Sequence, residues 1–473
     1  MYGIVINNLN DLSNNKSFEY VNKIFDDNIV HNISINIQEF YLNDLLLNAE
    51  KEIFFPCDII IDGELFENVA IRAKGNSSLS QVVNSNSNKY SFKIKFDYFN
   101  KNNSYYGLKE LILNNLVSDN TFIKDYIVFD MMNYMGVVTP KNAYSIIKIN
   151  NENWGLYLGI ESIDDVFLAR NYGNNYGFLY KPEPVPGNEI NSLNDNGADL
   201  VYYGESQKYY SGIFNNSESS ISNYDKLRLI NSIKKLNEVE NGHLILDIEK
   251  TIKYFVVHNF VVSFDSYTGP VAHNYYLYEN NGIISVLPWD YNLAFGEFSV
   301  GKKWFKNTKL DTNNIIVNMP IDNPLVGCNI EERPLWGNIV NNENNLILYH
   351  RYFNDFIKNY FESGYFEDKI NFIYELLIPV IDNRKEFYSR EEFINGIDTL
   401  KELSILRSIS VKKQLLGEIK IDSLDEQNYI DASSLNLDNL GSLNNFNSKK
   451  DILLSKNVKE QINSTEKVTG VSF

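Results

Sequence analysis

The sequence predicts an α+β protein in which a sheet-rich part precedes a mainly helical part. Alternating apolar and polar residues, which are typical of strands, recur up to about residue 163. From Asp225 onward the apolar residues follow the spacing of helices. With 473 residues, 44% of them hydrophobic, the chain is long enough to bury a sizeable core in two or three domains. We therefore expect two lobes that meet near residue 163.

The sheet-rich part is expected to contain one helix among its strands. Strands are expected at residues 30–37, 59–65, 68–75, 89–97, 142–150 and 154–161. The helix is expected over residues 119–135, with Ser118 or Asp119 as its N-cap and Gly136 as its C-terminal stop. The Ser/Asn-rich residues that precede the strand 89–97 predict a loop.

Four regions follow from these patterns. They are an irregular N-terminal segment (1–29), a sheet-rich N-lobe with one helix (30–163), a helical C-lobe (164–417) and a polar, solvated C-terminal tail (418–473). Inside the C-lobe, residues 182–224 are rich in Pro, Gly, Ser and Asn and predict an insertion or lid loop. Residues 248–264 are apolar nearly all round, which predicts a helix buried in the centre of the lobe.

Composition restricts the classes of partner. The formal net charge of -18 disfavours nucleic acid or an anionic membrane as the main partner and favours a cationic one. Cys57 and Cys328 are the only cysteines, so a disulfide framework and a Cys-type zinc site are not expected. The chain start has no basic region followed by an apolar core, and no apolar run reaches about 20 residues. We expect a soluble protein without a signal peptide.

The segment from Phe264 to Gly296 contains the strongest chemical signal. The dipeptide Asn281-Gly282 between two β-prone runs predicts a hairpin with a two-residue turn. The register counted outward from this turn places Asn274 opposite Trp289, with Asp290 beside Asn274. One carboxylate and one amide oxygen at the open end of a hairpin make a hard oxygen site that suits Mg²⁺, particularly when phosphates complete the coordination.

A second acidic residue, Asp265, lies close enough in sequence to reach the same cleft. It follows the predicted buried helix, and eight residues separate it from Asn274. An Asp, then an Asn, then a hairpin and a second Asp before a Gly is the order found in the catalytic and metal-binding loops of protein kinases. Taken alone, an Asp and an Asn in a turn are usually only turn chemistry. The prediction therefore depends on the whole order of lysine strand, helix, strand pair, helix and hairpin.

The lysine strand is the segment KYSFKIKFD at residues 89–97. Its aromatic and aliphatic side chains share one face, and Lys93 and Lys95 share the other. We therefore expect a lysine side chain to line the region of the protein that lies against this second face.

These residues resemble the spore-coat CotH family of kinase-like proteins. The matching segments are residues 72–78, 89–97, 155–161 with the SIDDVFL that follows, 177–181, 273–278, 288–296 and 407–415. The resemblance spans about residues 30–417. It implies an atypical protein-kinase-like two-lobed fold, with an antiparallel sheet-rich N-lobe and a mainly helical C-lobe. It also implies a kinase that uses ATP and Mg²⁺ to phosphorylate serine residues of spore-coat proteins.

The resemblance assigns roles to the residues named above. Asp265 would orient or deprotonate the acceptor hydroxyl. Asn274 and Asp290 would hold the metal ions. Lys95 would meet the nucleotide phosphates, with Lys93 as the second choice because the family pattern accepts Arg at that position.

Other residues in the matching segments are candidate nucleotide contacts, and each has an alternative. Ser77 lies in a turn whose N–H groups would cover the phosphates, or in a plain surface turn. Arg72 and Lys74 would face the cleft, or are solvated strand charges. Glu161 would contact the base or ribose, or caps the helix that follows. Lys181 would bind a phosphate, or forms a structural ion pair.

Two histidines lie near these segments. His273 is either a metal-adjacent group or a structural residue, and His258 in the buried helix is most simply a core histidine. The chain also departs from the expected pattern. Asn292 stands where the family often has a second Asp, which removes one charge from a second ion site. The helix 119–135 has no Glu for the strand lysine, so Asp119 or Asp125 would substitute, or the pairing is absent.

Three functions remain open from the sequence. The first is a serine kinase acting on basic, Ser/Lys/Arg-rich spore-coat proteins, made in the mother-cell cytoplasm and deposited in the coat. The second is a catalytically weak pseudokinase that acts as a structural coat-assembly protein, which Asn292 favours. The third is an AMP transferase on the same fold.

Overall fold

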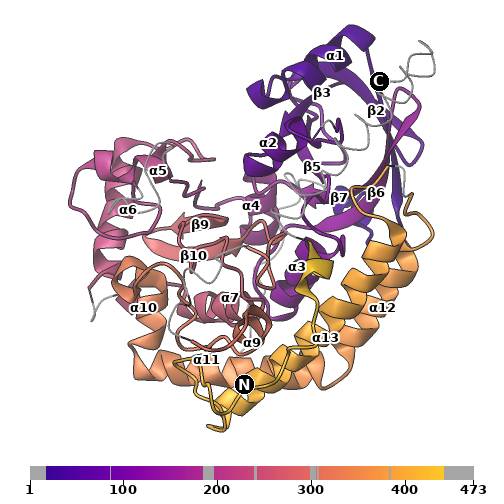
Figure 1. Cartoon of the computed structure of the whole chain (residues 1–473). Helices are drawn as coiled ribbons and strands as arrows, with labels where there is room; N and C mark the ends of the chain where they lie inside the picture. The colour runs from indigo at the N-terminus through magenta and orange to yellow at the C-terminus, as the bar shows by residue number, and fades with distance from the viewer. Residues whose placement is uncertain are drawn as a thin grey trace, which may run out of the picture.

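A computed structural model describes residues 18–85, 87–184, 196–238, 242–298, 305, 308–382 and 385–441. These residues form a mixed α+β protein, which confirms the α+β part of the expected fold class (Figure 1). A barrel built from the first part of the chain lies beside a mainly helical part.

The barrel consists of seven strands in the order β1-β2-β3-β4-β5-β7-β6. The strands are β1 (His31–Ile37), β2 (Phe55–Ile61), β3 (Glu64–Lys74), β4 (Ser91–Lys95), β5 (Glu110–Asn114), β6 (Asn142–Ile149) and β7 (Glu152–Glu161). Strand β1 pairs antiparallel with β2 and parallel with β6. The parallel pair closes the barrel, so the sheet is not purely antiparallel as expected.

The barrel interior has its own apolar core. It contains Ile35, Ile59 and the two apolar residues Phe92 and Ile94 of β4, all fully buried. The alternation predicted for β4 is therefore confirmed, and its two lysines lie on the outer face. That outer face is the surface on which the candidate site is built.

Several short elements of the barrel region differ from the expectation. The predicted strand 59–65 contains a turn at Asp62-Gly63, which joins β2 to β3, and Gly63 has a φ of 90°. The predicted Ser/Asn-rich loop contains the helix α2 (Ser77–Val83), whose Leu79 and Val82 side chains are buried. Strand β5 was not expected. The helix α1 (Glu39–Leu47) was not expected either, so this region has more than one helix.

The helix α3 (Lys124–Tyr134) starts five residues later than predicted. Its N-cap position is Ile123, not Ser118 or Asp119. The Asp119 carboxylate nevertheless accepts a hydrogen bond from the backbone N–H of Lys124 at 2.9 Å, so it satisfies a free N–H of the first turn from outside the helix. The helix stops before Gly136 as expected, and that glycine has a φ of 79°.

The second part combines helices with a small sheet. Its helices include α4 (Asp165–Tyr172), α5 (Ser211–Phe214), α6 (Asn223–Leu236), α7 (Ile248–Phe260), α9 (Thr312–Val317), α10 (Pro334–Val340), α11 (Glu343–Phe356), α12 (Tyr365–Leu377) and α13 (Arg390–Leu415), with a π-helical turn at Ile357–Phe361. The sheet has the order β10-β9-β8, with β8 (Phe178–Tyr180), β9 (Tyr275–Asn280) and β10 (Ile283–Pro288). In Figure 1 the long helices α12 and α13 run side by side toward the barrel.

The larger of two apolar cores lies in this part, and α7 runs through it. From Thr251 to Phe260 nearly every residue of α7 is buried, as predicted, although the helix ends four residues earlier than expected. The described part of the predicted lid, 182–184 and 196–224, contains α5 and a short 3₁₀ turn at Gln207–Tyr210, and residues 185–195 lie outside the described residues.

The segment 418–441 is not a solvated tail. Ile419, Ala432, Leu435 and Leu440 are buried, and the backbone N–H of Asn120 bonds the carbonyl of Leu440. The apolar residues are spaced widely in a polar sequence, so periodicity did not reveal the packing. Residues 442–473 lie outside the described residues.

A helix that crosses a membrane needs about 20 predominantly apolar residues, and the helices of the described segments fall short of this.

Candidate active site

The site lies at the open end of the β9–β10 hairpin. The predicted turn and register are confirmed, because Asn280 pairs with Ile283 and Tyr275 with Pro288. Asn274 and Asp290 therefore lie just beyond the two strand ends. Both have left-handed backbone conformations, with φ of 57° and 59°. Asn and Asp tolerate this conformation better than most residues, so the chain can turn there while keeping an oxygen ligand.

Asn274 is held in one orientation by Asp265. Its Nδ2 atom donates to the backbone carbonyl of Asp265 at 2.8 Å and to Asp265 Oδ2 at 3.1 Å. Both amide hydrogens are thereby used, which leaves Asn274 Oδ1 facing away from Asp265. Among the described residues, no hydrogen bond occupies that oxygen. The amide is thus oriented to accept from, or coordinate, a group outside the protein.

Asp265 is also paired with His273. The Nε2 atom of His273 lies 2.6 Å from Asp265 Oδ1, and its Nδ1 atom lies 3.9 Å from Glu183 Oε2. Burial lowers the pKa of His273, but the hydrogen bond and the charge of Asp265 outweigh burial, so its pKa is raised. Both ring nitrogens of His273 thus face carboxylates, with Asp265 as the nearer partner.

Asp290 and Lys74, the last residue of β3, line the same small cavity. Its lining includes Lys74, Asp125, Trp289 and Asp290. Among the described residues, neither the Lys74 ammonium nor the Asp290 carboxylate forms a hydrogen bond or a contact ion pair. The Lys74 ammonium lies 5.8 Å from the centroid of the Trp289 ring. Two opposite charges thus face each other across a gap.

Desolvation dominates the pKa values of this cavity. Burial lowers the pKa of Lys74 to about 8, although the attraction of Asp290 acts against this shift. Burial likewise raises the pKa of Asp290, opposed by Lys74 and Lys181. A carboxylate that is desolvated without a direct partner is costly, and a bound cation would relieve that cost.

The helix α3 holds the loop that carries Asp290. Asp125 Oδ1 accepts from the backbone N–H of Tyr291 at 2.6 Å, and Lys124 Nζ donates to the carbonyl of Asn292 at 3.2 Å. Burial, and next the charge of Asp290, raises the pKa of Asp125 to about 8. From the sequence, Asp125 is one of two residues that could replace the missing Glu as the partner of the strand lysine. The structure instead joins it to the loop.

Lys93 and Lys95 share a partner that the sequence analysis missed. Glu110, the first residue of β5, lies 2.7 Å from Lys93 Nζ through Oε2 and bonds Lys95 through Oε1. Burial alone would raise the pKa of Glu110, but the two lysines hold it at about 2. A five-residue strand gives little periodic signal, so neither β5 nor its glutamate could be recognised. Neither Asp119 nor Asp125 contacts these lysines.

The remaining basic candidates are distributed around the cleft. Arg72 lies directly opposite Lys93 in the β3–β4 pair, and its Nη1 atom is 2.5 Å from Glu52 Oε2. Lys181, just after β8, is 2.9 Å from Glu183. Its charge is close enough to influence the pKa values of Lys74 and Asp290, although Lys181 is not among the residues that line the cavity.

Ser77 follows the cavity residue Lys74 by three positions in the sequence, but it is not among the residues that line the cavity. It is exposed and is the first residue of α2. The N–H of Gly75, two residues earlier, donates to Glu52 at 3.2 Å. At least this N–H of the predicted phosphate-covering turn is therefore already used.

Glu161 is buried in a structural network. Its carboxylate accepts from Arg170 Nε at 3.0 Å and Nη2 at 2.5 Å, from the backbone N–H of Lys141 at 3.0 Å and from the Tyr20 hydroxyl. It does not cap α4, because Asp164 accepts from the first N–H groups of that helix. The contacts of Glu161 tie the N-terminal segment and β7 to α4.

Breaking this network should affect stability and not nucleotide binding. We expect Arg170→Ala to lower the free energy of unfolding by about 3–5 kcal/mol, because Glu161 would stay buried without its partner. Denaturant unfolding measures the loss. The KM for ATP should stay at its wild-type value, and a large rise in that KM would place Glu161 in the nucleotide site after all.

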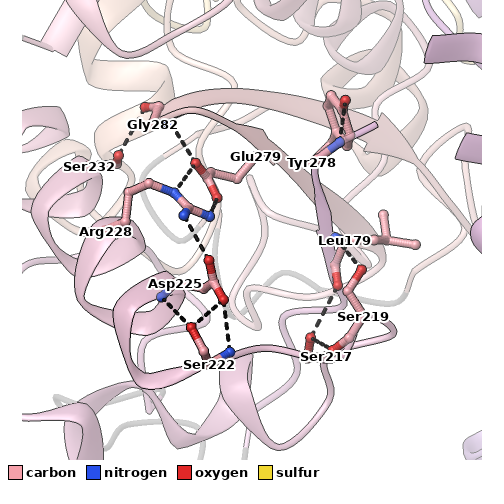
Figure 2. A network of polar contacts seen from close by, with 11 residues as sticks. Leu179, Ser217, Ser219, Ser222, Asp225, Arg228, Ser232, Tyr278, Glu279 and Gly282 are labelled. Atoms are coloured by element: carbon pink, nitrogen blue, oxygen red, sulfur yellow. Dashed lines mark hydrogen bonds and ion pairs between the residues drawn. The ribbon is translucent and has the colours of Figure 1, made fainter. Parts of the chain in front are cut away.

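The other end of the hairpin is fixed by an ion-pair network (Figure 2). Arg228 of α6 donates to both carboxylate oxygens of the fully buried Glu279, at 2.8 and 2.6 Å, and to Asp225 at 2.7 Å. Ser232 donates to the carbonyl of Gly282 at 2.9 Å, and the N–H of Gly282 bonds Glu279. The hairpin is thus anchored at its turn, so that its open end presents Asn274 and Asp290 from a rigid support.

The donor set fits a magnesium ion that is bound together with phosphates. In the described part of the chain, no three His, Cys, Asp or Glu side chains gather as a metal cage. Asp290 and the amide oxygen of Asn274 would supply two hard oxygen ligands. Mg²⁺ usually keeps several waters and binds through one or two carboxylates plus substrate phosphates, so two protein ligands are sufficient.

Comparisons with known proteins identify the family of this chain. The family model described as CotH kinase protein matches residues 71–409, which is most of the chain. Inner spore coat protein H of Bacillus subtilis (strain 168) is 23% identical over 203 residues, covering 42% of this chain and 54% of that relative. The chain thus spans about half the length of this curated relative. The resemblance identified from the sequence motifs is confirmed, and the chain belongs to the family of CotH kinase proteins.

Proposed function

We propose that this chain is an atypical protein kinase that transfers the γ-phosphate of ATP to serine residues of spore-coat proteins. The barrel and the helical part would form the two lobes, with the nucleotide between them. The observation that carries the proposal is the cavity in which Lys74 and Asp290 face each other without direct contact. The negative phosphates of ATP would balance the charge of Lys74, and a magnesium ion would balance the charge of Asp290.

Each charged group around the cavity has a chemical task in this proposal. Asp290 and Asn274 Oδ1 would hold Mg²⁺, which supplies positive charge to the phosphate oxygens when it is bound. Lys74 would balance phosphate charge from the opposite side, and Lys181 adds a further cation. The raised pKa of Asp290 and the lowered pKa of Lys74 both result mainly from burial without a direct partner. Mg²⁺ would be the partner of Asp290, and the ATP phosphates would be the partner of Lys74.

Asp265 is the residue placed to accept the proton of the acceptor hydroxyl. Its two oxygens are held by His273 and Asn274, so the carboxylate has a fixed orientation beside the metal ligand. A general base needs this kind of positioning within hydrogen-bond reach of the hydroxyl. The imidazole of His273 would stabilise the negative charge on Asp265 until the acceptor arrives.

The proposed acceptors are basic spore-coat proteins. The formal net charge of -18 favours a cationic partner through electrostatic complementarity. The matched relative is named an inner spore coat protein, which supports a place in the spore coat for this chain as well. Synthesis in the mother cell followed by deposition in the coat would be consistent with basic acceptors and with a place in the spore coat.

Labelled ATP tests the proposal directly. Purified protein incubated with ATP, Mg²⁺ and a Ser/Lys/Arg-rich peptide should transfer label from the γ-position. Mass spectrometry of the peptide distinguishes a phosphoryl group from an adenylyl group, which separates kinase from AMP transferase. No transfer with any divalent metal by a folded protein would reject both, and would favour a structural coat-assembly role, for which Asn292 is the supporting observation.

The two lysine positions should differ in their effect on catalysis. We expect Lys74→Ala to lower kcat/KM for ATP by about 100-fold or more, because Lys74 is the cation among the residues that line the cavity. Lys95→Ala should cost less than about 10-fold, since Lys93 keeps its ion pair with Glu110. Steady-state rates over a range of ATP concentrations measure both. A larger loss for Lys95→Ala would move the phosphate site to β4, where the sequence analysis placed it.

A further inference from the structure

We propose that His258, on the buried helix α7, is a positioning residue that joins the Asp265 loop to the Asp290 loop. This inference rests on the proposed function for its catalytic consequence. The ring lies in the core and is 1% exposed. Its Nε2 atom is 3.0 Å from Ser266 Oγ and 2.9 Å from Thr268 Oγ1. Its Nδ1 atom is 3.1 Å from the hydroxyl of Tyr291.

Two of these three contacts are sequence neighbours of a site residue. Ser266 directly follows Asp265, and Tyr291 directly follows Asp290. One imidazole ring therefore bridges the segment that carries the candidate base and the segment that carries the metal ligand. Because the two segments are separated in sequence by the hairpin, their relative position depends on contacts of this kind.

The hydrogen-bond directions can be assigned from the donors. The Ser266 hydroxyl donates to the carbonyl of Ser263 at 2.5 Å, so it can only accept from His258. The Thr268 hydroxyl donates to the same carbonyl at 3.4 Å and can likewise accept, so Nε2 carries the hydrogen and Nδ1 accepts from the Tyr291 hydroxyl. The ring uses both nitrogens in the neutral state. Burial lowers the pKa of His258 to about 3, which agrees with a ring that stays neutral at physiological pH.

Aromatic packing prevents the ring from turning away. Tyr254 stacks on it with ring centroids 5.2 Å apart and planes inclined by 16°. Phe255 and Tyr291 approach it edge-on, at 6.0 and 5.9 Å. A ring clamped in this way can fix the two loops, whereas a mobile ring could not.

The central test replaces His258 by Phe, which keeps an aromatic ring and removes the hydrogen bonds of both ring nitrogens. We expect the Mg²⁺ concentration for half-maximal transfer to rise about 10- to 100-fold, the range typical when a support of a metal ligand is lost. Hydrogen–deuterium exchange should become faster in residues 263–268 and 288–296 together. His258→Asn, whose amide can reach the Tyr291 hydroxyl, should restore part of the Mg²⁺ dependence.

Tyr291→Phe and Tyr349→Phe serve as companion variants. Tyr291→Phe removes only the link to the Asp290 loop, so exchange should rise in residues 288–296 alone, and this variant decides the matter should His258→Phe fail to fold. Tyr349 is a buried tyrosine of α11 whose hydroxyl donates to the carbonyl of Ile321 at 2.9 Å. Tyr349→Phe should lower the melting temperature and leave both loops and the Mg²⁺ dependence unchanged.

Two results would overturn the inference. The first is wild-type exchange in both loops of folded His258→Phe. The second is an equal increase in Tyr349→Phe, which would show only general loosening of the core. If the wild-type protein transfers no phosphate, the proposed function fails, and the exchange measurements still decide whether His258 couples the loops.

Discussion

Asp290→Asn is expected to reduce phosphate transfer about 1000-fold or more and, at the same time, to raise the melting temperature of the ligand-free protein. The loss follows because a neutral amide is a much weaker Mg²⁺ ligand than a carboxylate. The gain follows because the Asp290 carboxylate is desolvated and has no contact partner among the described residues, so its charge opposes folding. Asn also tolerates the left-handed backbone at this position.

Asp322→Asn is a suitable control for this variant. Asp322 Oδ1 lies 2.8 Å from His350 Nε2, so its carboxylate already has a partner within the protein. Removing that charge should lower the melting temperature and leave transfer unchanged. Addition of ATP and Mg²⁺ should raise the melting temperature of the wild-type protein and of Asp322→Asn, but not of Asp290→Asn. A destabilised Asp290→Asn that still transfers phosphate would mean that Asp290 is a structural residue.

Asp265→Asn is the second change with a large expected effect. Transfer should fall about 1000-fold or more, because the amide cannot accept the hydroxyl proton. Nucleotide binding should remain, since Asp265 is not one of the two proposed metal ligands. Single-turnover transfer and the melting-temperature rise with ATP and Mg²⁺ measure these two properties separately.

The same variant distinguishes an enzyme from a scaffold. If catalysis is the function, spores that carry Asp265→Asn should show a coat defect although the variant still reaches the coat. Normal coat assembly with the inactive variant would favour the structural role instead. His350→Phe, which changes a histidine ion pair away from the cavity, controls for effects of stability on deposition.

Local signals predicted the β9–β10 hairpin better than they predicted the barrel. The Asn281-Gly282 turn fixes the hairpin register through adjacent residues, and from that register Asn274 and Asp290 could be placed correctly. The alternation in residues 91–95 similarly predicted which face of β4 carries the lysines. Both inferences needed only short-range geometry.

Features that depend on distant partners could not be found in this way. The parallel pairing of β1 with β6 joins segments about a hundred residues apart, and neither strand has a local sequence signal that identifies the other as its partner. From the sequence, Lys74 could not be distinguished from the other basic candidates, because it is the shared cavity with the distant residue Asp290 that sets it apart. Glu110 was missed because its strand was too short to be recognised.

Barrel closure has a practical consequence for where the chain may be cut. The family match begins at residue 71, inside β3, whereas the barrel begins forty residues earlier with β1. A fragment trimmed to residues 71–409 would lack β1 and β2 and would expose the backbone edges of β3 and β6 to other molecules. Expression of the matched segment alone should therefore yield aggregates, and a usable recombinant fragment has to start upstream of His31.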